Sequence, residues 1–60
     1  MKMTIEMRMD NAAFTDYPGM ETARILHKLA ELVSEDSPEG VYPLMDINGN
    51  RVGDATFSTE

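Results

Sequence analysis

Residues 20–35, METARILHKLAELVSE, form the one stretch of this 60-residue chain that is long and periodic enough to predict an amphipathic helix. At 100° per residue, the apolar side chains fall within one arc of about 120°. That arc holds Thr22, Ile25, Leu26, Leu29, Leu32 and Val33. The opposite, polar arc holds Glu21, Arg24, Lys28, Glu31 and Glu35. One apolar stripe and one polar face predict a helix that packs on a single partner layer.

Strands are expected on both sides of this helix. Lys2 to Met9 alternates strictly between apolar and polar residues, which predicts a half-buried strand. Its apolar face consists of Met3, Ile5, Met7 and Met9. We expect this face to pack under the helix, and the alternative is an interface that can repack around a partner. Asp10-Asn11 ends the strand, and Phe14 is expected to plug one end of the sheet.

A hairpin is expected after the helix. Val41 to Ile47 predicts a strand, and Pro43 assigns it to an edge because proline lacks a ladder donor. Asn48-Gly49 favours a type I′ turn, in which both central residues have positive φ. Residues 50–58 predict the third strand, with a change of phase near Gly53 that indicates a bulge.

These elements predict one α+β domain over residues 1–60, ordered β-α-β-β. A helical crossover leaves the first two strands parallel in direction, and the hairpin reverses the third. Placing the third strand in the centre makes every neighbouring pair antiparallel and leaves Pro43 on an edge. We therefore expect a three-stranded antiparallel sheet of order 1-3-2, with the helix packed on one face.

The charge of the chain is unevenly distributed. Acidic and basic residues balance in residues 1–28, so the formal net charge of −6 arises in residues 29–60, where Arg51 is the only base. Such a field opposes direct binding to nucleic acid or anionic lipid and favours a basic partner. No apolar run approaches the roughly 18 residues needed to cross a bilayer, and cysteine is absent. A cytoplasmic setting is expected.

One acidic run is unusual. Glu31, Glu35, Asp36 and Glu39 follow one another without an intervening base at the expected end of the helix, where the macrodipole makes acids mildly unfavourable. A row of carboxylates can imitate the charge of duplex DNA, about one per 1.7 Å of axis. The alternative is an ordinary solvated loop. Further partner-binding carboxylates are expected from Asp46 and Asp54.

Asp46, Asn48 and Asn50 reproduce the D-x-N-x-N opening of a calcium loop, in which alternate side-chain oxygens meet a hard cation. Arg51 stands where that loop requires glycine, and Phe57 where it requires a bidentate glutamate. We interpret the segment as a polar hairpin turn, and we expect neither a metal nor a cofactor.

Catalysis is not expected. His27 is the only histidine, and it lies at the boundary of the polar helix face. Glu31 and Glu35 share a helix face, but catalytic carboxylates need burial to shift their pKa values. A chain this short seldom encloses the roughly 300–1,000 Å³ that a substrate pocket requires.

MDNAAF after the first strand, the ARIL-x-KLAE helix and DINGNRVG in the hairpin resemble short uncharacterised proteins of phages and prophages. The resemblance covers most of the chain. It implies action in the cytoplasm of a bacterial host, by a protein that disables host machinery. Small acidic anti-CRISPR and anti-restriction proteins are similar in size and charge, and some of them act as DNA mimics.

Two functions are therefore predicted from the sequence. The first is a non-catalytic inhibitor that docks on a basic, nucleic-acid-binding surface of a host defence complex through the acidic residues named above. The second is a self-associating module, a possible homodimer, whose open sheet face or edge strand pairs with a second copy. Thr4, Glu6 and Arg8 would form that sheet face.

Overall fold

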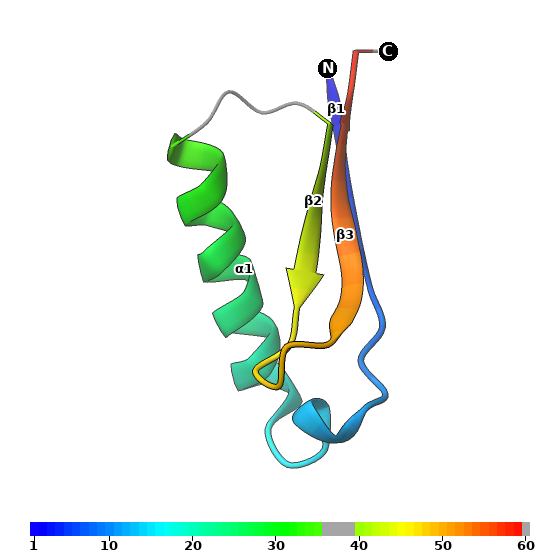
Figure 1. The fold of residues 1–60 in the computed structure, drawn as a ribbon, viewed down its shortest axis with the longest axis vertical. Coiled ribbons are helices and arrows are strands. Elements are labelled where there is room, and N and C mark those ends of the chain that lie inside the picture. The colour runs from blue at the N-terminus through cyan, green and yellow to red at the C-terminus, as the bar shows by residue number, and fades with distance from the viewer. Residues whose placement is uncertain (36–39, 60) are drawn as a thin grey trace.

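A computed structural model describes residues 1–35 and 40–59 of the chain. Strand β1 spans Lys2–Met7, the 3-10 helix η1 spans Ala12–Phe14 and helix α1 spans Pro18–Glu35. Strands β2 and β3 span Gly40–Met45 and Arg51–Ser58. The sheet is antiparallel in the order β1-β3-β2, and α1 lies on one side of it, next to β2 (Figure 1). The predicted α+β fold and strand order are confirmed.

The register of the strands defines two faces of the sheet. The face toward α1 carries Ala55 of β3, opposite Ile5 on β1 and Tyr42 on β2. The next row on the other face carries Asp54, opposite Glu6 and Pro43. Thr4, Thr56 and Val41 form a further row on that face. No described element covers this second face, which we call the outer face.

The predicted change of phase near Gly53 is confirmed. Leu44 pairs with Gly53 and Met45 with Arg51, so Val52 has no partner on β2. Consecutive residues of β3 therefore both turn inward, and Val52 and Gly53 are both buried. The backbone of β1 approaches Gly53 so closely that a side chain there would overlap it, which explains the glycine.

The hairpin is found where it was expected, but the predicted type I′ turn is wrong. No described residue other than glycine has a positive φ, so Asn48 does not adopt the conformation that this turn requires. Of the two central residues of the predicted turn, only Gly49 has a positive φ, of 83°. The amide of Gly49 donates to the carbonyl of Asp46 at 3.0 Å, and the amide of Asp46 donates to the carbonyl of Asn50 at 2.8 Å. Three residues, 47–49, therefore lie between the hydrogen-bonded pair Asp46 and Asn50, one more than the two of the predicted turn.

The hydrophobic core lies between α1, η1 and the β2–β3 hairpin. It consists of Phe14, Ile25, Leu29, Leu44, Val52 and Ala55. Phe14 plugs the end of the sheet as predicted. These six residues come from η1, α1, β2 and β3, so the core joins all elements except β1 directly to one another.

The apolar face of β1 is covered less than expected. Met3 and Ile5 remain 49% and 40% exposed, and only Met7 packs against the core. The reason is the position of α1, which lies next to β2 at the opposite edge of the sheet (Figure 1). Leu26, on the predicted buried stripe of α1, is 41% exposed for the same reason.

Candidate functional site

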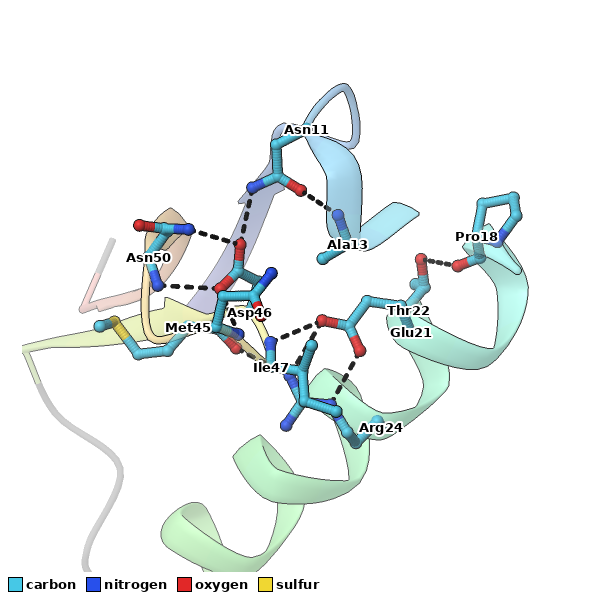
Figure 2. A network of polar contacts seen from close by, with 11 residues as sticks. Asn11, Ala13, Pro18, Glu21, Thr22, Arg24, Met45, Asp46, Ile47 and Asn50 are labelled. Carbon is cyan, nitrogen blue, oxygen red and sulfur yellow. Dashed lines mark hydrogen bonds and ion pairs between the residues drawn. The ribbon is translucent and has the colours of Figure 1, made fainter. Parts of the chain in front are cut away.

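A network of polar contacts around two buried carboxylates, Glu21 and Asp46, organises the hairpin end of the molecule (Figure 2). Asp46 follows β2 and is only 4% exposed. Its Oδ1 accepts the backbone amides of Asn48 at 2.9 Å and Asn50 at 2.8 Å. Its Oδ2 accepts from the side-chain amides of Asn11 at 2.7 Å and Asn50 at 3.3 Å. The carboxylate thus shapes the loop that replaces the type I′ turn.

Asn11 joins this loop to the segment after β1. Its side-chain oxygen accepts the backbone amide of Ala13 at 3.0 Å and caps η1, while its nitrogen donates to Asp46. One amide side chain therefore caps η1 and also bonds to Asp46, which lies 35 residues after Asn11 in the chain. This contact holds η1 so that Phe14 enters the core.

Glu21 and Arg24 connect α1 to the same hairpin. Glu21 is 7% exposed, and its carboxylate accepts from Arg24 Nε at 2.9 Å, Arg24 Nη2 at 3.1 Å and the Ile47 amide at 2.8 Å. Arg24 Nη2 also donates to the carbonyl of Met45 at 3.1 Å. Through these contacts to Ile47 and Met45, the bidentate ion pair of Glu21 and Arg24 connects the first turns of α1 to the end of β2.

The electrostatics agree with this geometry. Hydrogen bonding by Arg24, reinforced by the Ile47 amide, lowers the pKa of Glu21 against an opposing effect of burial. Hydrogen bonds from the Asn50 amide and its neighbours lower the pKa of Asp46 in the same way. Both carboxylates are therefore held in the charged form by donors of this chain.

The assignment of Glu21 to the polar helix face is wrong, because the Ile47 amide and Arg24 draw its carboxylate against the hairpin. Asp46 was expected to face a partner, but its carboxylate points into the protein. Asp54 does lie at the surface, 3.5 Å from Arg51 Nη2. It faces away from α1, however, and so does not share a surface with Glu31 of that helix.

Of the remaining predicted partner-binding residues, Glu31 is exposed on α1. Asp36, Glu39 and the side chain of Glu35 lie outside the described residues. Thr4 and Glu6 of the predicted dimer face do share the outer face with Thr56 and Asp54. Arg8 lies just beyond β1, where its amide donates to the carbonyl of Val52 at 2.7 Å.

Sequence reasoning missed the internal role of the carboxylates. The role of Asp46 could have been predicted, because an aspartate that accepts a hydrogen bond from the amide two residues later is a common turn motif. The pairing of Glu21 with Arg24 at i, i+3 was also readable. The contact of Glu21 with Ile47 joins residues far apart in the chain, and no local pattern announces it.

The described surface includes open grooves, of which three have volumes of about 420, 370 and 460 Å³. The first lies between α1 and β2, and the third lies beside η1. The second lies between α1 and β1 and is almost entirely apolar. Its lining residues are Met3, Ile5, Leu26, Leu29, Ala30, Val33 and Ser34. We call it the β1 groove.

The first of these grooves has Arg24, Lys28 and Asp46 in its lining, and the third has Asp16, Glu21 and Arg24. His27 is exposed and lines none of them. Within residues 1–35 and 40–59, no three histidine, cysteine or acidic residues cluster in a way that could hold a metal ion. Asp46 is surrounded by hydrogen-bond donors, which is the reverse of a cation site.

Comparison of the chain with protein-family models, with curated proteins and with solved structures gave no match in any of the three. The described helix is too short or too polar to cross a membrane.

Proposed function

We propose that this chain is a small acidic protein-binding module without catalytic activity, an inhibitor of the phage type that docks on a basic, nucleic-acid-binding surface of a host defence complex. One observation carries the proposal. Helix α1 has no basic residue in its last turn, Glu31 is exposed one turn before the end of the helix, and Glu35, Asp36 and Glu39 follow in the sequence. The acids of this run have no base among them.

Three other acidic side chains of the chain are buried or lie beside a base, which supports the assignment of partner binding to the run from Glu31 to Glu39. Glu21 and Asp46 are buried, and Asp54 has Arg51 beside it. These three carboxylates contribute little to an attractive field at the surface. The run from Glu31 to Glu39 then holds four of the eight remaining acids within nine residues, which makes it the densest source of the field that a cationic partner would meet.

The test is a pull-down from bacterial lysate with this protein as bait. The variant E35K/D36K/E39K removes the acidic run. The variant D10K/D16K/E60K changes the net charge equally, at positions outside the run. Competing duplex DNA and increasing salt are added in parallel, since contacts that replace phosphates weaken steeply with salt.

The proposal expects capture of a nucleic-acid-binding protein by the natural sequence and by D10K/D16K/E60K. It expects loss of that protein with E35K/D36K/E39K and with competing DNA. Equal capture by both variants would refute docking through the run. Equal loss in both would show that only net charge matters.

Self-association is the second candidate function, and a specific observation favours it. Strand β1 is an edge strand, all its residues except Met7 are exposed, and both its neighbouring outer face and the β1 groove are open. An uncovered edge of this kind is a template for pairing with another chain. Sedimentation analysis over a range of concentrations tests this candidate, and a monomer throughout would contradict it.

A further inference from the structure

The edge of β1 has a defined pattern of free backbone groups. The amide of Arg8 donates to the carbonyl of Val52 on β3. In an antiparallel ladder the direction of these groups alternates along the strand, so Thr4 and Glu6 also direct theirs toward β3. Met3 and Ile5 direct their amides and carbonyls outward, where the described residues form no further strand.

The two edges of the sheet differ in their protection. The β2 edge contains Pro43, which removes a donor and obstructs a neighbouring strand. The six residues of β1 contain no proline, and no register shift interrupts its pairing with β3. Natural proteins usually protect such an edge, so its regularity calls for an explanation.

We infer that the outer edge of β1 pairs antiparallel with β1 of a second copy, about a two-fold axis at Thr4. In this register Met3 lies opposite Ile5 of the second copy, and these residues exchange the outward hydrogen bonds. Lys2 lies opposite Glu6 of the second copy on the outer face. The symmetry creates each of these contacts twice.

The charges of β1 select this register. Only shifts by two residues preserve the match of outward backbone groups. Moving the axis to Ile5 places Lys2 opposite Arg8, and moving it to Glu6 places that glutamate opposite itself. Both arrangements bring like charges together, which is unfavourable across strands. The axis at Thr4 pairs residues 2–6 with one another, and the charged pair that it forms, Lys2 with Glu6, is opposite in sign.

Glu6 provides an independent reason for the same pairing. Its neighbour across the ladder within the monomer is Asp54, another acid. No ion pair joins Glu6 to a base within the described residues, whereas Asp54 has Arg51. Lys2 of the second copy would supply the missing positive charge on the free side of Glu6.

The apolar side chains of β1 complete the interface. A two-fold axis perpendicular to the sheet keeps both helices on one side of a six-stranded sheet. The exposed side chains of Met3 and Ile5 then pack against Ile5 and Met3 of the second copy. The β1 grooves of the two copies also become one continuous apolar surface.

This inference rests on self-association and is independent of docking through the acidic run. Charge reversal tests it. Lys2→Glu and Glu6→Lys each convert two attractive contacts into two repulsive ones, and each should weaken dimerisation roughly ten- to a hundredfold. The double variant K2E/E6K restores opposite charges and should dimerise like the natural sequence.

The controls separate this register from effects of net charge and of folding. Glu6→Lys changes the net charge from −6 to −4, so the general repulsion between two copies would fall. Weaker dimerisation of this variant would therefore be due to the broken pairing with Lys2 and not to net charge. Lys28→Glu matches the charge change of Lys2→Glu on the helix and should leave dimerisation unchanged. Sedimentation equilibrium measures the association, and circular dichroism verifies that each variant is folded.

Two results would overturn the inference in distinguishable ways. A natural chain that stays monomeric at every concentration would remove both the dimer and the second candidate function. A natural dimer that folded single variants leave intact, or that the double variant does not restore, would refute the register and leave self-association standing. Neither result bears on capture through the acidic run.

Discussion

Replacement of Gly53 by alanine should disrupt the junction between β1 and β3. A Cβ atom at this position would lie 2.8 Å from Met7 Cα and would overlap the carbonyl group of Glu6. Overpacking typically costs about 1–3 kcal/mol. Here the obstacle is backbone, which cannot rotate away, so we expect a loss of about 3 kcal/mol. A domain of this size has a total stability of about 3–9 kcal/mol.

Thermal unfolding followed by circular dichroism checks this prediction. For a domain this small, the loss corresponds to a melting temperature lowered by roughly 12–24 °C. Gly19→Ala is the matched control, because no atom lies within 4 Å of its added Cβ. Gly19 is helical, so alanine should stabilise the protein by up to about 1 kcal/mol. A Gly53→Ala protein that melts within a few degrees of the natural sequence would refute the close approach of β1.

Three further predictions concern the polar network and the core. Because hydrogen bonds hold the pKa values of Asp46 and Glu21 below their ordinary 3.8 and 4.5, their stabilisation is complete above those values and lost as the pH falls through the lowered ones. Denaturation below about pH 5 should therefore be shallower in Asp46→Asn than in the natural sequence, and equal slopes would contradict the network. Calcium should leave the melting temperature unchanged, since donors occupy both oxygens of Asp46, and a calcium-dependent rise would show otherwise. Phe14→Ala should cost about 3–5 kcal/mol in chemical denaturation, whereas Tyr17→Ala, at a 69% exposed site, should change stability by no more than about 0.5 kcal/mol.

The strand order was predictable because it follows from connectivity. A helical crossover, a tight hairpin and Pro43 at an edge leave few arrangements, and all three features are local in the sequence. The bulge was readable for the same reason, as a break in alternation near Gly53. Local signals of this kind depend on backbone geometry, which neighbouring residues determine.

The site could not be predicted in the same way. The helical periodicity predicted that Glu21 faces solvent. That prediction depends only on positions around the helix and takes no account of the elements that pack beside it. The hairpin supplies a free amide at Ile47, and this distant donor decides where the carboxylate goes. The loop around Asp46 likewise depends on Asn11, on the other side of α1 in the sequence.

The open face of β1 reflects a similar limit. The alternation of Met3 and Ile5 correctly indicated which side faces α1, but not how far the helix reaches across the sheet. That distance depends on packing against β2 and η1. A half-covered face is the consequence, and its exposed side chains of Met3 and Ile5 supply the apolar part of the proposed dimer contact.

The central proposal for this molecule is that it binds other protein chains. At the edge of β1 the proposal names the residues that pair with each other. Amide hydrogen exchange at low and high protein concentration tests it directly. Thr4 and Glu6 face β3, so their amides should be protected at both concentrations, whereas the amides of Met3 and Ile5 should become protected only as the concentration rises. Free exchange of Met3 and Ile5 at every concentration would contradict pairing through this edge.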